Sequence, residues 1–294
     1  MSKTATTALQ IGHSPDPDDA FMWYPLADID GTGPKVDTGR YHFQHVLEDI
    51  ESLNHRAERG ELEITAISIH QYAYVAGQYA LTACGSSMGD GYGPMIIANR
   101  PLTLDDLPNI KIAVPGERTT AFLAASLMIA ESSGGVLDYD VVMFDQIIPA
   151  VVAGKYDAGL IIHEGQLTYA DAGLEKIVDL GQWWQRSRHL PLPLGGNAVR
   201  RDLASQFGPI CRILLNSIHY ALDHRAEAVD YAMNYARDMG ADLADRFVGM
   251  YVNDWTLDYG QIGRLAVKRL LDDGAKAGLI PAVADLDLIN PDPE

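Results

Sequence analysis

This chain of 294 residues contains only two cysteines, no long apolar run and few basic side chains. Cys84 and Cys211 lie far apart in the sequence, so they form neither a metal-ligand motif nor a disulfide framework. No stretch approaches the roughly 20 apolar residues that a membrane-spanning helix needs, so we expect no membrane partner. The first residues are polar and include no apolar signal region, which predicts a cytoplasmic protein.

Basic residues number 22 against 40 acidic ones, which gives a formal net charge of −18. Binding of nucleic acid needs a cluster of basic side chains, so nucleic acid is not an expected partner. An acidic protein can still bind a small anion through backbone N–H groups at the start of a helix. A hydrophobic content of 47% is enough for one large domain or two of moderate size.

Strand and helix patterns alternate over the first two-thirds of the chain and give way to helices alone after Arg200. This order predicts an α/β fold whose sheets are of the parallel type, with a helical C-terminal segment. The predicted strands are 8–12, 41–47, 62–67, 95–98, 111–114, 141–144, 158–162 and 177–180. The predicted helices are 20–26, 48–58, 69–76, 119–130, 147–153, 202–222, 226–239, 242–252 and 259–277.

Two segments rich in proline, 99–108 and 190–197, are typical of crossovers between lobes. We therefore predict one lobe made of residues 1–98 and 198–294, and a second lobe of residues 99–197 inserted into it. A ligand would then bind in the cleft between the two lobes.

Several short motifs point to metal or phosphate chemistry but do not fit it. The acidic run Asp16–Asp19 would need Gly and Glu at the positions of Phe21 and Ala27 to bind calcium, so it is interpreted as a turn that caps a helix. His42 and His45 would point to opposite faces of a strand and could not share a metal. Because no motif implies a metal or a nucleotide, no cofactor is expected.

Three predicted strand ends carry useful side chains, and ligands of open parallel sheets bind beyond such ends. Thr119 and Thr120 open an apolar helix, where free N–H groups and hydroxyls suit a carboxylate or phosphate; an ordinary threonine cap is the alternative. Ser68 could offer its hydroxyl and its amide to the same ligand, although serine is also a common helix cap.

His163 follows the apolar run that ends at Ile162. Partial burial would favour the neutral imidazole, which can accept a proton from a substrate. The alternative is a polar residue placed where the chain returns to solvent.

A set of motifs in a fixed order over residues 9 to 202 resembles one known family. The motifs are GHSPDPDDAFMWYPL, VLEDIESLN, GYGP, AVPGERTTAF, AGLIIHE, DLGQWW and LPLPLG. The family is 1,4-dihydroxy-6-naphthoate synthase of the futalosine route to menaquinone.

The resemblance implies a two-lobed fold like that of type II periplasmic binding proteins, with mixed sheets flanked by helices. It implies a cofactor-free lyase that cleaves cyclic dehypoxanthine futalosine, a small anionic aromatic substrate, to 1,4-dihydroxy-6-naphthoate and dihydroxyacetone. His163 takes the position of the family's catalytic base. The positions that bind substrate are Ala66, Ile67, Ser68, Thr119 and Thr120, with Ser14 and Asp18 as further candidates.

The sequence departs from the family pattern at three of these places. Ala66 stands where the family has lysine, Asp16 where cysteine is usual and Asp18 where asparagine is usual. The exact substrate is therefore open, and two alternatives remain: a cytosolic protein that binds a small carboxylate, or a related enzyme of the chorismate dehydratase type.

Two further questions stay open at this stage. Trp183 or Trp184 could stack on a flat ligand or pack between the lobes. The helical C-terminal segment could form the interface of a homodimer.

Overall fold

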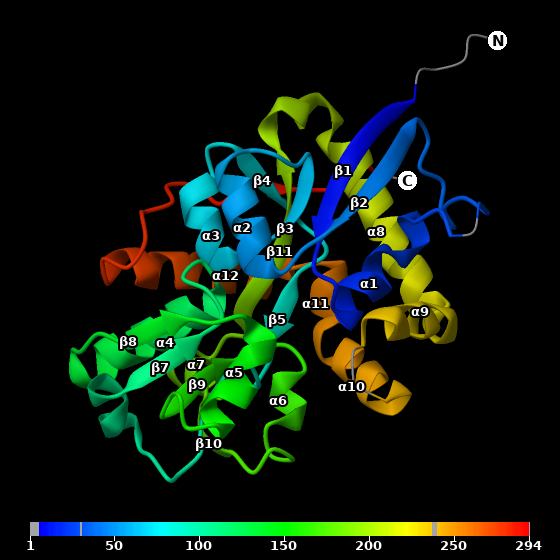
Figure 1. Ribbon diagram of the computed structural model, residues 1–294. Helices are drawn as coiled ribbons and strands as arrows, with labels where there is room; N and C mark the ends of the chain where they lie inside the picture. Colours follow the sequence, from blue (N-terminus) through cyan, green and yellow to red (C-terminus); the bar gives the residue numbers. More distant parts are fainter. Residues whose placement is uncertain (1–5, 30, 237–239, 294) are drawn as a thin grey trace, which may run out of the picture.

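The computed structural model describes residues 6–29, 31–236 and 240–293 and contains two mixed β-sheets flanked by helices (Figure 1). The strand order of the seven-stranded sheet is β12-β4-β11-β3-β1-β2, and β5 also pairs with β11. In this sheet β1 is parallel to β2 and β3, whereas β11 is antiparallel to β3. Its strands are β1 Thr7–His13, β2 Tyr41–Leu47, β3 Ile64–Ser68, β4 Tyr79–Thr82, β5 Ser87–Gly89, β11 Leu192–Arg200 and β12 Leu288–Ile289.

The five-stranded sheet has the order β10-β6-β9-β7-β8. Here β7 is parallel to β8 and β9, and β6 is antiparallel to β9 and β10. The strands are β6 Met95–Ala98, β7 Lys111–Val114, β8 Asp138–Val141, β9 Ala158–Ile161 and β10 Glu175–Asp179. Both sheets therefore combine parallel and antiparallel pairs, as the resemblance implied, and the expectation of parallel-type sheets from the alternating pattern is wrong because β4, β5, β6, β10 and β11 form antiparallel pairs.

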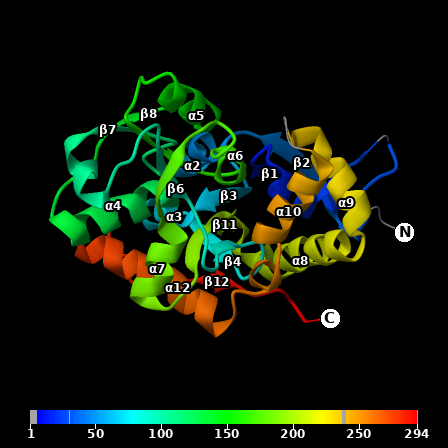
Figure 2. The same ribbon diagram turned by 90° about the horizontal axis from the view of Figure 1, so that it is seen from below.

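Helices cover both sheets, and those after β11 lie mainly beside the seven-stranded sheet (Figures 1 and 2). The α-helices are α1 Pro17–Trp23, α2 Ile50–Glu58, α3 Ile69–Val75, α4 Thr120–Ser133, α5 Phe144–Val152, α6 Gly165–Thr168, α7 Leu180–Arg188, α8 Phe207–Asp223, α9 Arg225–Ala232, α10 Ala241–Tyr251, α11 Asp254–Leu257 and α12 Gly260–Lys276. Short 3-10 helices are η1 Tyr24–Leu26, η2 Leu104–Asn109, η3 Arg201–Gln206 and η4 Met233–Tyr235. None of the helices in the described ranges is both long and apolar enough to cross a membrane.

Helix α4 shows how the local sequence sets an element that borders the ligand cleft. The Thr119 side chain accepts the backbone N–H of Phe122 and so caps the start of the helix. Gly134 ends the helix in the left-handed conformation, φ 66°, which glycine adopts at little cost. Most of the side chains between these two residues are apolar and buried, so α4 is an interior helix. Packing of these side chains fixes the position of its N-terminus at the cleft.

The largest apolar cluster joins the two sheets. It contains Ile67 of β3, Ile96 of β6 and Leu160 of β9, together with buried residues of α4, α7 and α12. A second cluster lies between β1, α1 and α8, and a third covers the other face of the five-stranded sheet. The sheets therefore pack against a common set of helices on one side.

The predicted strands 41–47, 95–98 and 111–114 are confirmed with the same bounds. The predicted strand 141–144 is wrong in register, because β8 ends at Val141 and Phe144 already begins α5. Strands β4, β5 and β12 and helix α7 were not predicted. The predicted helix 226–239 ends within residues that lie outside the described part of the chain.

The segment 190–197, predicted as a crossover between the lobes, contains a strand that was not predicted. Most of this segment belongs to β11, an inner strand of the seven-stranded sheet. Its pairing with β5 shifts between Pro193 and Gly195, and such an irregularity is where a strand tolerates proline. The proline and glycine content hid the strand pattern.

The boundaries predicted for the two lobes remain predictions, although the membership of the sheets refines them. Strand β6 at 95–98 belongs to the five-stranded sheet, and β11 belongs to the seven-stranded sheet from Leu192 onward. We therefore propose that the inserted lobe begins before Met95 and ends before Leu192, a few residues earlier than predicted on each side.

The two cysteines, distant in sequence, are neighbours in the structure. The Sγ atoms of Cys84 and Cys211 are 3.9 Å apart, both thiols are buried and no disulfide joins them. The Cys211 thiol donates to the carbonyl of Ile289 at 3.2 Å. The pair lies where α8 meets the end of β4 and the C-terminal strand β12, and β12 itself pairs with β4, so this part of the C-terminal segment is fixed to the sheet.

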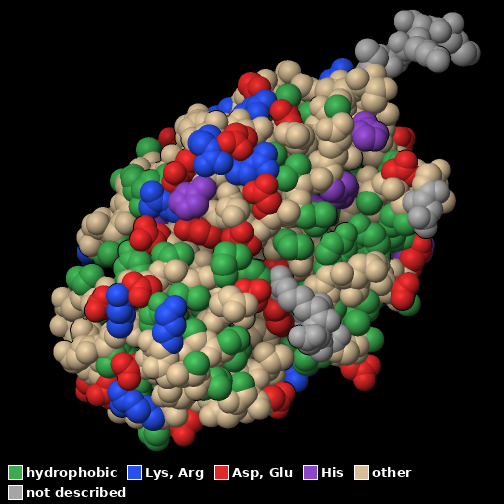
Figure 3. Space-filling model, viewed as in Figure 1, with side chains coloured by type: hydrophobic (Ala, Val, Ile, Leu, Met, Phe, Trp, Pro, Cys, Tyr) green, Lys and Arg blue, Asp and Glu red, His purple; other side chains and the backbone are tan. Residues whose placement is uncertain are grey.

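On the face shown in Figure 3, the basic side chains near α2 lie among acidic ones. Arg56 forms ion pairs with Glu48 and Glu61, and Arg118 forms one with Glu58. These basic side chains are therefore engaged with carboxylates of the same chain.

Candidate functional site

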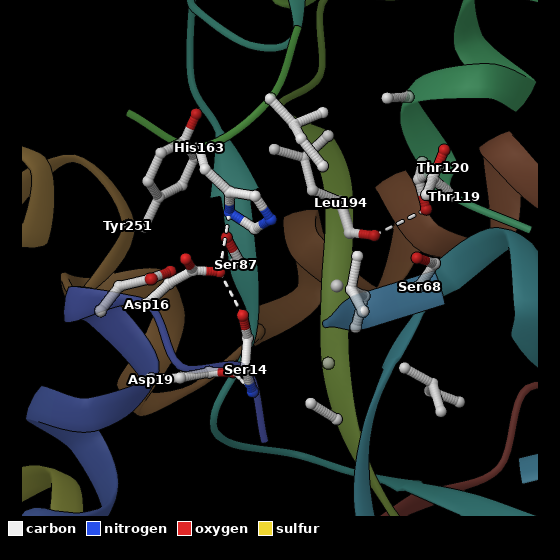
Figure 4. A pocket seen from close by; sticks show the side chains of 18 of the residues that line it. Ser14, Asp16, Asp19, Ser68, Ser87, Thr119, Thr120, His163, Leu194 and Tyr251 are labelled. Carbon is white, nitrogen blue, oxygen red and sulfur yellow. Dashed lines mark hydrogen bonds and ion pairs between the residues drawn. The ribbon is translucent and has the colours of Figure 1, made fainter. Parts of the chain in front are cut away.

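A pocket lies between the two sheets, and all the site residues predicted from the sequence line it. The pocket encloses about 760 Å³ of empty space, part of it continuous with solvent, which is within the range of small-molecule sites. The predicted residues in its wall are Ser14, Ala66, Ile67, Ser68, Asp18, Thr119, Thr120 and His163. Figure 4 shows His163 and the acidic residues on one side of the pocket and Ser68 with the threonines on the other.

Hydrogen bonds within the protein already engage the hydroxyls of both threonines. Thr119 Oγ1 donates to the carbonyl of Gly116 at 2.8 Å and accepts the N–H of Phe122. Thr120 Oγ1 donates to the carbonyl of Leu194 at 2.6 Å and accepts the N–H of His70 at 3.1 Å. The expectation of two hydroxyls free for a ligand is therefore wrong: distant parts of the chain supply their partners.

At the start of α4, the backbone N–H groups are still available to bind an anion. Thr120 and Ala121 are the first two residues of α4, and their N–H groups have no hydrogen-bond acceptor among the described residues. These N–H groups lie at the positive end of a helix of 14 residues. Ala121 was missed from the sequence because its part in the site is made by its backbone alone.

Ser68 keeps only part of its predicted role. Its backbone N–H donates to Asn54 Oδ1 at 2.9 Å, so the amide that we expected to contact a ligand is already used. Its Oγ accepts from Asn54 Nδ2 at 3.0 Å, which leaves the hydroxyl proton free to be donated into the pocket. Asn54 is fully buried on α2 and holds Ser68 from behind, a contact that no local sequence pattern indicates.

Ala66 and Ile67 precede Ser68 in β3, and their side chains contribute differently to the pocket. Successive strand residues point to opposite faces, and the Ile67 side chain lies in the main apolar core. Ala66 is 7% exposed and packs with Leu53 and Leu62. The methyl group of Ala66 leaves room in the pocket but brings no charge.

His163 lies two residues beyond the end of β9. Its Nδ1 is 3.2 Å from Asp16 Oδ2, and the edge of its ring meets Phe144 with the centroids 5.0 Å apart. Its Nε2 is shielded from solvent and has no hydrogen-bond partner among the described residues. The backbone at His163 has φ 52°, a left-handed conformation that is uncommon for residues other than glycine and is found at functional sites.

The acidic run does not cap its helix as predicted. Asp16 occupies the N-cap position of α1, but its side chain makes no capping hydrogen bond. It instead accepts a short hydrogen bond from the Ser14 hydroxyl and faces His163. Asp19 accepts the N–H of Ser14 at 2.7 Å.

Burial changes the ionisation of this acidic cluster. Desolvation raises the pKa of Asp18 well above the usual range of an aspartate, and the nearby charges of Asp19 and Asp16 raise it further. The pKa of Asp19 is raised as well, again mainly by desolvation. Protonation of Asp18 relieves the repulsion that a full set of carboxylates would exert on an anion in the pocket.

This ionisation predicts a pH-dependent stability for Asp18→Asn. A raised pKa in the folded state favours the protonated carboxyl, so the stability that it contributes is present at low pH and is lost as the pH rises through that pKa. Asparagine cannot ionise, so we expect the variant to gain in free energy of unfolding relative to the wild type as the pH rises from about 4, the usual pKa of an aspartate, to about 8, the raised pKa of Asp18. The gain is at most about 1.4 kcal/mol per pH unit for one proton.

Urea denaturation at each pH would measure the difference. Asp171→Asn, at an exposed position outside the pocket, removes one carboxyl of ordinary exposure and is the matched control. A difference between Asp18→Asn and the wild type that stays constant with pH would contradict the raised pKa.

Sequence reasoning missed three further contributors to the pocket. Phe247 and Tyr251 come from α10, and the Tyr251 hydroxyl donates to Gln166 Oε1 at 2.8 Å. Asn197 of β11 donates from Nδ2 to the carbonyl of Gly85 at 2.8 Å, whereas its buried Oδ1 has no partner among the described residues. An amphipathic helix and a strand rich in glycine carry no signal that would single these residues out.

Neither tryptophan of the DLGQWW motif lines this pocket. Trp184 is fully buried in the main core, and its indole N–H donates to the carbonyl of Pro191 at 3.1 Å. The guanidinium of Arg188 lies 4.8 Å from the ring centre of each tryptophan and pairs with Glu131 and Asp273. Of the two interpretations of the tryptophan pair, packing is the one that these contacts support.

Two mixed sheets with a ligand pocket between them define the class of protein. The fold is that of the periplasmic binding proteins: a Candida albicans protein described as having the generic periplasmic binding protein fold superposes with a TM-score of 0.67 at 14% identity, over 98% of each chain. Protein AF1704 from Archaeoglobus fulgidus superposes with a TM-score of 0.86 at 42% identity, over 93% of this chain and 98% of its own.

The sequence identifies the family within this class. The sequence model of the menaquinone biosynthesis family matches residues 9–276, and the chain belongs to that family. Two curated relatives are named 1,4-dihydroxy-6-naphthoate synthase. The one from Thermus thermophilus is 38% identical over 92% of this chain and 96% of its own, and the one from Streptomyces coelicolor is 37% identical over 94% and 95%.

Proposed function

We propose that this protein is a carbon–carbon lyase that cleaves cyclic dehypoxanthine futalosine to 1,4-dihydroxy-6-naphthoate and dihydroxyacetone. The family and the names of the curated relatives support this reaction. The single observation that carries the chemistry is that a shielded imidazole nitrogen, His163 Nε2, and the free N–H groups at the start of α4 belong to one pocket.

In this proposal the two sides of the pocket have different tasks. The N–H groups of Thr120 and Ala121 and the hydroxyl of Ser68 bind the substrate carboxylate. His163 Nε2 accepts the proton of a substrate hydroxyl. The electrons of that oxygen form a carbonyl while the adjacent carbon–carbon bond breaks, and the electron pair of the broken bond stays on the ring fragment, which then takes up a proton.

The direct test is an assay of the purified protein with cyclic dehypoxanthine futalosine. We expect dihydroxyacetone and the naphthoate to appear in equal amounts without added metal or cofactor. Parallel incubation with chorismate separates this activity from a chorismate dehydratase. Binding of the futalosine without turnover would replace the lyase by a carboxylate-binding protein.

Ser68→Ala tests the side of the pocket assigned to the carboxylate. The change removes one hydroxyl donor from the pocket. It also removes an acceptor of Asn54 Nδ2, but this group still donates to the carbonyl of Arg118 at 3.3 Å, so it is not left without a hydrogen bond. Loss of one hydrogen bond to a charged group costs about 1.5–3 kcal/mol, so we expect KM to rise about 10-fold or more while kcat changes less. Ser132→Ala, at an exposed position on α4, should leave both constants unchanged. An unchanged KM in Ser68→Ala would remove this hydroxyl from the carboxylate site.

We further propose that the protein works in the cytoplasm on a small anionic aromatic substrate. We also propose a homodimer, for which the exposed Ile262 and Leu265 on α12, each 55% exposed, offer an apolar contact. Sedimentation of the purified protein would show one species of twice the chain mass, whereas a monomer would contradict the dimer.

A further inference from the structure

We propose that Asp16 is the positioning residue of the base: its carboxylate accepts the Nδ1 proton of His163 and so leaves Nε2 as the nitrogen that accepts the substrate proton. This inference deepens the proposed function and rests on it. The family pattern has cysteine at this position, so the charged partner of the histidine is a feature of this chain.

The geometry indicates that the contact between Asp16 and His163 is held in a defined position. Asp16 Oδ2 lies 3.2 Å from His163 Nδ1 and also accepts the hydroxyl of Ser14, so one oxygen is held from two sides (Figure 4). A carboxylate oxygen beside one ring nitrogen selects the tautomer with the proton on that nitrogen. The other ring nitrogen is then the unprotonated one.

Burial strengthens this selection. The Asp16 side chain is 1% exposed and that of His163 is 17% exposed, so little water competes for the contact. A buried carboxylate is costly unless it is paired and hydrogen-bonded, and His163 and Ser14 supply these partners. The ring of Phe144 also packs against the imidazole, at an interplanar angle of 71°.

The two residues come from different sheets. Asp16 follows β1 of the seven-stranded sheet, and His163 follows β9 of the five-stranded sheet. Any opening of the pocket that separates the sheets at this point also separates the carboxylate from the imidazole. The contact between Asp16 and His163 therefore joins the two sheets at the pocket.

Four other ionisable groups belong to the surroundings of the imidazole: Asp18, Asp19, Tyr251 and Glu164. Asp18 and Asp19 belong to the same acidic cluster and have raised pKa values, and Tyr251, whose pKa is also raised by burial, donates its hydroxyl to Gln166. Glu164 follows His163 directly in the chain. Asp16 lies within ion-pair distance of His163, with its Oδ2 3.2 Å from Nδ1.

The test uses nitrogen-15 NMR of the imidazole in the ligand-free protein, so it does not depend on turnover. The His163 signals are assigned by their absence in His163→Gln. In the wild type, at a pH where the ring is neutral, we expect Nδ1 protonated and Nε2 unprotonated. The opposite tautomer in the wild type would overturn the proposal, whatever the variants do.

Asp16→Asn supplies the second measurement. The amide can donate to Nδ1 as well as accept from it, so we expect a mixed or reversed tautomer, a fall in kcat of about 30- to 100-fold and a KM within about threefold of the wild type. Asp171→Asn, exposed and outside the pocket, should change none of these. Unchanged His163 signals and kcat in a folded Asp16→Asn would overturn the assignment, whereas a wild type with the expected tautomer but no lyase activity would overturn only the proposed reaction.

Discussion

His163→Gln is expected to lower kcat for the formation of dihydroxyacetone by about 10³-fold, within the range of 10²–10⁴ that a positioned general base contributes. Glutamine is of similar size and polarity but cannot accept a proton at neutral pH. The N–H groups at the start of α4 and the Ser68 hydroxyl are on the other side of the pocket and are untouched by the change. KM should therefore change by less than about fivefold.

The measurement is a steady-state assay of dihydroxyacetone, with circular dichroism to show that the variant is folded. His55→Gln is the matched control, because His55 is exposed on α2, outside the pocket, and forms ion pairs with Glu51 and Glu58 of its own helix. Turnover by His163→Gln at the wild-type rate would exclude this histidine as the base.

Trp184→Ala is expected to lower the free energy of unfolding by about 3–5 kcal/mol, the usual cost of removing a large buried aromatic side chain. Trp184 is fully buried in the cluster that joins the two sheets, and its loss also leaves the carbonyl of Pro191 without its indole partner. The neighbouring Arg188 would lose one of the two rings beside its guanidinium.

Urea denaturation of the variant would give this free energy, and Trp183→Ala is the comparison within the same motif. Trp183 is only partly buried, so its replacement should cost less than about half as much. Equal losses for the two variants would contradict the assignment of Trp184 as the packed member of the pair.

The three strand ends that the sequence singled out border one pocket, for a reason that the sequence shows only in part. Ser68 is the last residue of β3, Thr119 and His163 come after β7 and β9, and ligands bind beyond such ends. The strands, however, belong to two sheets rather than one. Their ends meet because the sheets face each other across the pocket.

Other parts of the site were beyond sequence reasoning. Strand β11 supplies Leu194 and Asn197, but its proline and glycine residues hide the alternation that marks a strand. Tyr251 lies on a helix whose buried face is like that of any amphipathic helix. Asn54 holds Ser68 from a position 14 residues earlier, where nothing local indicates a contact.

The sequence by itself determined the alternation of strands and helices, the threonine cap of α4, the place of His163 at a strand end and the resemblance to a family. Each of these depends on neighbours along the chain, which periodicity and motifs record. Only the tertiary structure decided that the hydroxyls of both threonines are engaged, that the amide of Ser68 belongs to Asn54 and that Asp16 faces His163. The availability of a polar atom to a ligand depends on hydrogen-bond partners that folding brings from distant parts of the chain.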